Sequence, residues 1–347
     1  MIWFRSDYSL GAHPDVLKAL CDTNGENTDG YGIDPHCENA ANIIKELTGV
    51  ENCAVHFLHG GTPCNIVTIS AALRPYEAVV CAKTGHIYAH ETGGVEATGH
   101  RVITVDGIDG KLTPALLEKA LIECSDEHTL SAKMVYISQP TEIGTVYSKR
   151  ELTALREKCL EKGLYLYIDG ARLGSALTSS ENDIDIKMLA SLCDVFYIGG
   201  TKNGALMGEA LVITNMAIDD HFRWMIKQHC SMLAKGRILG VQFEVLLTGG
   251  EDSLYYKIAA HANKMAERLR RGISCLGVEF LGNSPTNQVF PILPVSVIEA
   301  LEKDFFFTPW GEVENGMMPI RLVTSFGTTE AEVDSFIMKL SELITGK

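Results

Sequence analysis

Short runs of apolar residues recur along the chain between residues 53 and 214, and amphipathic stretches separate them. The runs are rich in Val, Ile, Leu and Tyr, which is typical of strands that are buried on both faces of a sheet. The intervening stretches repeat apolar residues every three or four positions, as a helix with one buried face does. We predict strands at residues 53–58, 77–82, 101–105, 132–138, 164–168, 195–199 and 209–214, and helices at residues 13–22, 35–49, 64–73, 111–124, 148–163 and 185–194.

This alternation of strands and helices predicts an α/β fold in which helices cover both faces of a mostly parallel sheet. The pattern changes near Gly250, where a long helix precedes shorter strands and a final helix at residues 329–344. We therefore predict a large domain over residues 1–249, which includes the N-terminal segment, and a smaller α+β domain over residues 250–347.

The composition excludes several classes of protein. Of the 347 residues, 46% are hydrophobic and 21% are charged, which supports a folded core. The net charge of −14 repels phosphate backbones, so we expect no nucleic-acid partner. The ten cysteines form no C-x-x-C pair, so we expect mostly buried free thiols. Neither a signal-peptide pattern nor a run of about 18 apolar residues is present, so we expect a cytoplasmic protein without a membrane partner.

A glycine-rich loop follows the first predicted strand of the sheet. Gly60, Gly61 and Thr62 stand where the backbone can approach a ligand closely and where a helix N-terminus can bind phosphate. The loop has neither the G-K-[ST] of a Walker loop nor the G-x-G-x-x-G fingerprint, which disfavours a nucleotide-dependent dehydrogenase. An ordinary strand-to-helix turn is the alternative for this stretch taken alone.

Charged residues follow two other predicted strands. Asp169 comes directly after residues 164–168, so it is either a helix N-cap or the counter-ion of a buried cation, with Arg172 directed at the same pocket. Lys202 follows residues 195–199, so it is either a surface lysine or an amine whose pKa its pocket lowers. Such an amine is a nucleophile.

Taken together, the loop, Asp169 and Lys202 predict a site for pyridoxal 5′-phosphate. Lys202 would form the covalent bond to the cofactor, and the loop would bind its phosphate. Asp169 would keep the pyridine nitrogen protonated, so that the ring withdraws electrons from the substrate α-carbon. We predict no metal site, although His86, His90 and Glu91 are closely spaced, because a third ligand is uncertain and glycines follow.

Six motifs, in this order along the chain, resemble those of the L-threonine aldolases in the β-eliminating lyase group, and the resemblance runs over nearly the whole chain. They read "RSDY", "DGYGIDP", "GGTPCN", "GHIYAHETGG", "YIDGARLG" and "GGTKNG". The resemblance implies the aspartate-aminotransferase-like fold of pyridoxal phosphate enzymes, with a seven-stranded type of sheet. Lys202 then matches the Schiff-base lysine, Asp169 the partner of the pyridine nitrogen, and Arg172 the arginine close to the cofactor and the substrate carboxylate.

The resemblance also assigns roles to residues outside these three. Gly60, Gly61 and Thr62 match the phosphate loop, and His86 matches a histidine that stacks on the cofactor ring. Ser6 and Arg321 match residues that hold the substrate carboxylate, for which a guanidinium is well shaped. Tyr31 matches a tyrosine that reaches a neighbouring subunit's site, and Arg237 matches, more loosely, an arginine that reaches a phosphate across a dimer. A homodimer or homotetramer with shared active sites is therefore implied.

One position departs from the family pattern. Some members carry a histidine after the strand at residues 132–138, and it is proposed to accept the proton of the substrate hydroxyl. Glu142 stands there in this chain. A carboxylate can act as the base when its pKa and geometry suit, but Glu142 is equally a structural loop residue. His86 is the alternative base, acting directly or through water.

The resemblance implies aldol cleavage of L-threonine or L-allo-threonine, or of other β-hydroxy-α-amino acids, to glycine and an aldehyde. The nearest rival is β-elimination in the same site, which releases ammonia and an oxo acid. Transamination needs a second carboxylate site that the sequence does not reveal. A non-catalytic module with this fold is a further rival, but the complete set of lysine, aspartate, arginine and phosphate loop disfavours it.

Overall fold

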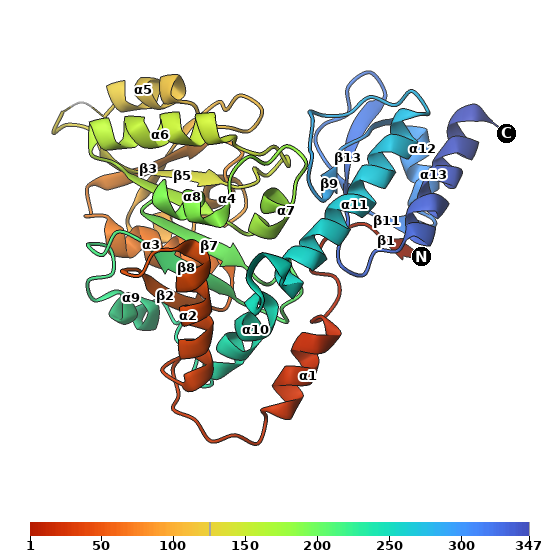
Figure 1. Ribbon diagram of the computed structural model, residues 1–347. Coiled ribbons are helices and arrows are strands. Elements are labelled where there is room, and N and C mark those ends of the chain that lie inside the picture. The colour runs from red at the N-terminus through yellow and green to blue at the C-terminus, as the bar shows by residue number, and fades with distance from the viewer. Residues whose placement is uncertain (125, 347) are drawn as a thin grey trace.

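A seven-stranded sheet forms the centre of the computed structural model, which describes residues 1–124 and 126–346 (Figure 1). Only β8 runs antiparallel to its two neighbours, and the other strands of the sheet are parallel. The mostly parallel α/β sheet predicted from the sequence is confirmed. In spatial order its strands are β2 (Ala54–Leu58), β8 (Glu209–Ile213), β7 (Val195–Gly199), β6 (Tyr165–Asp169), β5 (Ser131–Ser138), β3 (Glu77–Ala82) and β4 (Arg101–Val105).

Helices cover both faces of this sheet because successive strand residues point to opposite sides. Val135 and Ile137 of β5 pack in one core with helices α2, α5, α6, α8 and α10, whereas Met134 and Tyr136 pack in another core with α3 and α9. The bounds are α1 (Pro14–Asp22), α2 (Pro35–Thr48), α3 (Gly61–Ala72), α4 (His86–Ala89), α5 (Pro114–Ile122), α6 (Lys149–Lys162), α7 (Leu173–Leu177), α8 (Ile186–Ser191), α9 (Phe222–Gln228) and α10 (Arg237–Leu247).

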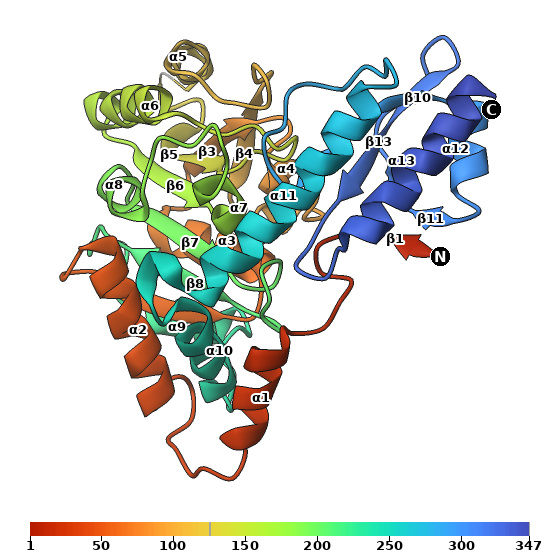
Figure 2. The ribbon, with the colours of Figure 1, turned by 45° about the vertical axis from the view of Figure 1, so that its right-hand side comes forward.

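The C-terminal part of the chain forms a smaller unit beside the sheet (Figure 2). Its long helix α11 (Leu254–Ser274) leads from the large unit into the small one, and a third core lies beneath it. β13 (Met317–Val323) pairs antiparallel with its neighbours in this unit. The remaining elements are β9 (Gln288–Val289), β10 (Ile292–Pro294), α12 (Val295–Leu301), β11 (Phe305–Phe306), β12 (Thr308–Pro309) and α13 (Glu330–Thr345).

The N-terminal strand belongs to this smaller unit. β1 (Ile2–Trp3) pairs in parallel with β11, and Phe4 is buried in the third core. The prediction from sequence placed this segment with the large domain. A strand of two residues is too short to show the alternation of apolar and polar positions by which strands are predicted. The division of the chain near residue 249 stays a prediction.

Local sequence signals account for several helix ends. Thr113 caps α5 by accepting the backbone N–H of Leu116, and Gly163 ends α6 with a φ of 64°, a left-handed conformation that suits glycine. All ten cysteines are free thiols, and six of them are buried. Among the described residues, no helix is both long and apolar enough to cross a membrane.

Candidate active site

Three parallel strands and one helix bring the candidate residues to the same edge of the sheet. Asp169 is the last residue of β6, and Lys202 follows β7 after Gly200 and Thr201. Glu142 follows β5, and Gly61 begins α3. Because the carboxyl ends of neighbouring parallel strands meet at one edge, residues far apart in sequence become neighbours there.

Asp169 is held by four hydrogen bonds from buried or partly buried donors. The hydroxyl of Tyr136 donates to Oδ2 at 2.5 Å, and the hydroxyl of Tyr197 donates to Oδ1. The backbone N–H of Ala171 donates to Oδ1 at 2.9 Å, and Asn65 Nδ2 donates to Oδ2 at 3.4 Å. Burial, followed by the charge of Asp169, raises the pKa of the Tyr136 hydroxyl, so this hydroxyl stays a donor. The network fixes the plane of a carboxylate that is only 4% exposed.

The amine of Lys202 forms no hydrogen bond or ion pair with the residues that the structure describes. Burial lowers its pKa, and the positive charge of Arg172 lowers it further. The carboxylates of Asp7, Asp169 and Glu209 oppose this shift without reversing it. A larger share of the amine is therefore neutral and nucleophilic at physiological pH, as attack on a carbonyl carbon requires.

A buried glutamate lies beside this lysine and was not singled out in the sequence. Glu209 begins β8, and its Oε2 accepts the backbone N–H of Gly200 at 2.7 Å. Burial raises the pKa of Glu209 to about 7, against the opposing effects of Thr201, Gly200 and Lys202. The folded chain thus keeps a proton on Glu209 at pH values where the unfolded chain, with an ordinary pKa of 4.5, has lost it.

The carboxyl group of Glu209 therefore costs stability as the pH rises from about 4.5 to about 7. We expect Glu209→Gln to raise the free energy of unfolding of the cofactor-free protein at pH 8 by up to about 3 kcal/mol. The gain should shrink towards zero near pH 4. Urea unfolding at both pH values measures it, with the exposed Glu302→Gln as the control. An equal effect of Glu209→Gln at the two pH values would contradict the assignment.

The glycine-rich loop provides a cradle for an anion at the start of α3. No side chain in the described part of the chain caps this helix, so the backbone N–H groups of its first turn are open to an acceptor. A Cβ atom at Gly61 would lie 2.8 Å from the hydroxyl oxygen of Tyr197, so only glycine lets the loop pack this closely against the Asp169 network. The helix begins at Gly61, three residues before the predicted start, because the loop itself forms the first turn.

Arg172 is anchored by an aspartate that the sequence analysis did not assign. Asp7, from the "RSDY" motif, accepts Arg172 Nε at 2.6 Å and Nη2 at 3.1 Å, and it also accepts Asn287 Nδ2 at 2.9 Å. Burial lowers the pKa of Arg172, but Asp7 more than offsets this effect, so the pKa lies above its ordinary value. The guanidinium is fixed on one edge by Asp7, and Nη1 has no hydrogen-bond partner among the described residues.

Arg321 stacks on an aromatic ring and lacks a partner for one buried nitrogen. Its guanidinium carbon lies 4.5 Å from the ring centroid of Trp310, and its Nε is buried without a partner among the described residues. Burial, and then the charge of Arg172, lower the pKa of Arg321 to about 10. Arg172 and Arg321 are like charges that repel each other, and the Nε of Arg321 is a buried donor without an acceptor among the described residues. Both features fit an anionic group bound between the two guanidinium groups. A substrate carboxylate has the matching charge and shape.

A histidine and two glutamates form a second cluster at this edge. His86 Nδ1 lies 2.7 Å from Glu91 Oε1, and Asn65 Nδ2 donates to the same oxygen at 2.6 Å. Glu142 Oε1 accepts the backbone N–H of His86 at 3.0 Å and the hydroxyl of Ser138 at 2.6 Å. Burial raises the pKa of Glu142. The structure therefore ties Glu142 to the backbone of His86, and its role as the base stays a prediction.

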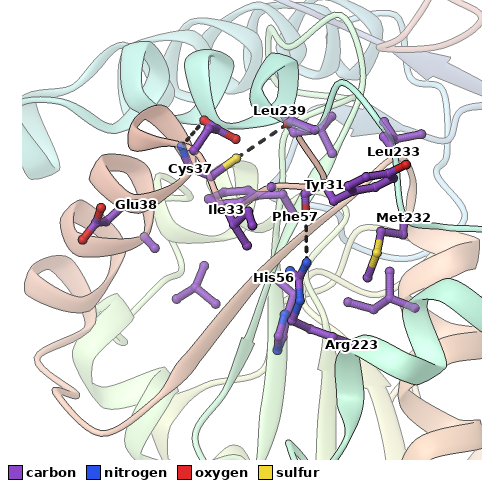
Figure 3. Close-up of a pocket in the computed structure, with 16 residues that line it drawn as sticks. Tyr31, Ile33, Cys37, Glu38, His56, Phe57, Arg223, Met232, Leu233 and Leu239 are labelled. Atoms are coloured by element: carbon purple, nitrogen blue, oxygen red, sulfur yellow. Dashed lines mark hydrogen bonds between the residues drawn. The ribbon is translucent and has the colours of Figure 1, made fainter. Parts of the chain in front are cut away.

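Three predicted site residues form no hydrogen bond or ion pair with the residues of this cluster in the described part of the chain. The hydroxyl of Ser6 pairs with that of Ser9 at 2.8 Å. Tyr31 is 48% exposed and lines a separate pocket with Arg223, whose Nη2 donates to the Tyr31 carbonyl at 3.0 Å (Figure 3). Arg237 begins α10 directly after Gly236, which lines the same pocket. The substrate role of Ser6 and the inter-subunit roles of Tyr31 and Arg237 stay predictions.

Comparisons with known proteins show the family of this chain. The sequence profile of the family described as beta-eliminating lyase matches residues 4–295. The chain belongs to the beta-eliminating lyase family. A low specificity L-threonine aldolase of a Pseudomonas species is 32% identical over 335 residues, which cover 95% of this chain and 94% of the relative. As a member of this family, the chain is an enzyme of the lyase class.

Solved structures show the same fold. A threonine aldolase of Leishmania major has a TM-score of 0.97 and 45% identity, and the match covers 99% of this chain and all of that one. An aspartate aminotransferase variant of Thermus thermophilus, at 16% identity, has a TM-score of 0.72 over 99% of this chain and 91% of its own. The aspartate-aminotransferase-like fold implied by the sequence motifs of this lyase family is confirmed.

Proposed function

We propose that the chain is a pyridoxal 5′-phosphate-dependent aldolase that cleaves L-threonine and L-allo-threonine to glycine and acetaldehyde. The observation that supports this most is the arrangement of Lys202, whose amine has a lowered pKa and no partner among the described residues, near the firmly held carboxylate of Asp169. The Pseudomonas relative and the Leishmania major structure named above are threonine aldolases, which supports the choice of substrate.

The residues present fit the cofactor. The open N-terminus of α3 suits its phosphate, the Asp169 carboxylate suits its protonated pyridine nitrogen, and the amine of Lys202 suits its aldehyde carbon. When bound there, pyridoxal phosphate supplies a conjugated ring that accepts the electron pair of a bond broken at the substrate α-carbon.

The chain's own residues orient the substrate and move its protons. Arg172 and Arg321 hold the substrate carboxylate from two sides, which fixes the direction of the Cα–Cβ bond. A base at the His86 and Glu142 cluster accepts the proton of the β-hydroxyl group as that bond breaks. Loss of this proton turns the Cβ hydroxyl into an aldehyde carbonyl, and a proton delivered to Cα completes glycine.

Arg321 provides a test of the carboxylate site. We expect Arg321→Leu to raise the KM for L-threonine by roughly 10- to 100-fold, because a charged hydrogen bond to the substrate carboxylate is lost. The turnover number should change less, since the reacting bond lies away from this contact. Steady-state kinetics measure both values. Arg268→Leu, which removes an exposed arginine paired with Asp334 on the same unit, is the control and should leave the KM unchanged.

A product assay tests the reaction itself. The purified, cofactor-loaded protein is incubated with each threonine diastereomer, and acetaldehyde, glycine, ammonia and oxo acid are quantified. Acetaldehyde matched by glycine supports the aldolase, and the two rates give the preference between diastereomers. Ammonia with oxo acid supports β-elimination instead, a reaction that the family's description also covers.

The same proposal includes a homo-oligomer in the cytoplasm. Tyr31 is exposed and has a φ of 61°, a left-handed conformation that its surroundings must hold, and Ile33 beside it is 66% exposed. These features support a surface that a second copy covers, as the resemblance of Tyr31 and Arg237 implies. The ten free thiols support a reducing compartment. Sedimentation of the loaded enzyme tests the assembly.

A further inference from the structure

We propose that Glu91 is a positioning residue that fixes His86 as the acceptor of the substrate's β-hydroxyl proton, and that Asn65 holds Glu91 in place. This inference rests on the proposed aldol cleavage, because it names the group that performs the proton transfer which that reaction needs.

The contact between His86 and Glu91 determines which ring nitrogen carries a proton. A carboxylate only accepts hydrogen bonds, so His86 Nδ1, 2.7 Å from Glu91 Oε1, carries the hydrogen. The neutral ring then presents Nε2 as a lone-pair acceptor. Among the described residues none forms a hydrogen bond with Nε2. The imidazole side chain is 34% exposed, whereas that of Glu91 is fully buried, so His86 is the member of the pair that a substrate can reach.

Asn65 makes this orientation rigid. It lies on α3 and is fully buried, and its Nδ2 donates to Glu91 at 2.6 Å and to Asp169 at 3.4 Å. Its Oδ1 accepts the hydroxyl of Tyr167 at 2.7 Å. The other oxygen of Glu91, Oε2, is buried without a partner in the described part of the chain, so His86 and Asn65 make both of the carboxylate's hydrogen bonds. The carboxylate therefore has one orientation, and His86 is linked through Asn65 to Asp169.

Glu142 is less suited to the proton transfer. Its Oε1 already accepts the backbone N–H of His86 and the hydroxyl of Ser138. These contacts fix the backbone of His86, while Glu91 fixes its ring. Two glutamates thus hold one histidine from both sides, and we assign the transfer to the histidine.

The proton transfer balances without any further reactant. The hydroxyl proton moves to Nε2 of His86, and the electron pair of the O–H bond becomes the second bond of the aldehyde carbonyl. The electron pair of the Cα–Cβ bond would be accepted by the conjugated ring that the proposed cofactor would supply when bound. His86, now cationic beside the carboxylate of Glu91, releases its proton once the aldehyde has left, and Cα takes up a proton to give glycine.

Two variants of Glu91 test this role in the loaded enzyme. We expect Glu91→Gln to lower the turnover number for L-threonine by roughly 10- to 1,000-fold, because a neutral amide no longer enforces the required tautomer. The KM should stay within about threefold. Glu91→Asp keeps the negative charge and should recover part of the lost turnover. Glu96→Gln makes the same substitution at an exposed glutamate five residues further along the chain, and it is the control.

A second readout does not depend on activity. In protein labelled with ¹⁵N-histidine, we expect the His86 resonance, assigned by its loss in His86→Phe, to show the Nδ1–H tautomer. Glu91→Gln should shift the population towards Nε2–H, in the cofactor-free and the loaded protein alike. An Nε2–H tautomer in the wild type, an unchanged turnover number in Glu91→Gln, or a rise in KM alone would overturn the proposal. Wild-type enzyme that releases no acetaldehyde would instead refute the proposed function. The tautomer of His86 would still show whether Glu91 determines which ring nitrogen carries the proton.

Discussion

Replacing Lys202 by alanine is expected to abolish steady turnover of L-threonine, by roughly four orders of magnitude or more. The side chain is the only candidate for a covalent bond to the cofactor among the described residues at this edge of the sheet. Lys202 forms no hydrogen bond or ion pair with the described residues, so its removal leaves no buried group unsatisfied. The loss of activity should therefore occur without a loss of stability.

Three measurements of the Lys202→Ala variant make this result specific. Turnover is measured with saturating cofactor, thermal unfolding gives the stability, and mass spectrometry after borohydride reduction shows whether the cofactor is attached covalently. Lys149→Ala, which removes an exposed lysine at the start of α6, should match the wild type in all three measurements. Retained turnover or retained covalent cofactor in Lys202→Ala would refute the assignment of this lysine.

Three of the residues that the sequence analysis found share a property: Gly61, Asp169 and Lys202 each lie at the end of a strand of the sheet or in the few residues that follow it. Apolar runs locate the strands, and parallel strands align their carboxyl ends, so Gly61, Asp169 and Lys202 are expected at one edge of the sheet. Their positions can therefore be predicted from local patterns together with one rule of topology. The same reasoning set the fold class.

The anchoring residues could not be found in this way. Asp7 contacts Arg172 across 165 positions and Asn287 across 280, and no periodicity in the N-terminal segment indicates either contact. The ring of Trp310 lies under the guanidinium of Arg321, and no pattern in the sequence indicates this contact. Long-range polar contacts depend on how the two units meet, which the pattern of a single chain does not encode.

The tyrosines in the predicted strands indicated a buried polar group, but the sequence analysis interpreted them only as part of the apolar core. Tyr136, Tyr167 and Tyr197 each lie in an apolar strand, and Tyr136 and Tyr167 are directly paired in register. All three side chains point to the face covered by α3. Tyrosine is seldom buried without a partner for its hydroxyl group, so three of them on one face indicate a buried polar acceptor. Two of these hydroxyls donate to Asp169, and the third donates to Asn65.

This network changes how the role of Asp169 should be tested. Alanine at this position would leave the hydroxyls of Tyr136 and Tyr197 and the backbone N–H of Ala171 without this acceptor, at about 1–3 kcal/mol for each buried group left unsatisfied. A loss of activity in Asp169→Ala would then reflect a damaged fold as well as a missing charge. Asparagine keeps the size of the side chain and one carbonyl oxygen, which can still accept the hydrogen bonds from Tyr197 and Ala171. The hydroxyl of Tyr136 can rotate to accept a hydrogen bond from the new amide group.

We expect Asp169→Asn to lower the turnover number for L-threonine by roughly 100- to 10,000-fold, while the midpoint of thermal unfolding stays close to that of the wild type. The physical reason is electrostatic: a neutral amide does not keep a proton on the pyridine nitrogen, so the ring withdraws electrons from Cα less strongly. Asp185→Asn, at the exposed N-cap of α8 where asparagine caps equally well, is the matched control and should retain full turnover. Near-normal turnover in Asp169→Asn would mean that the carboxylate organises the three tyrosines and Asn65 and takes no part in accepting the electron pair.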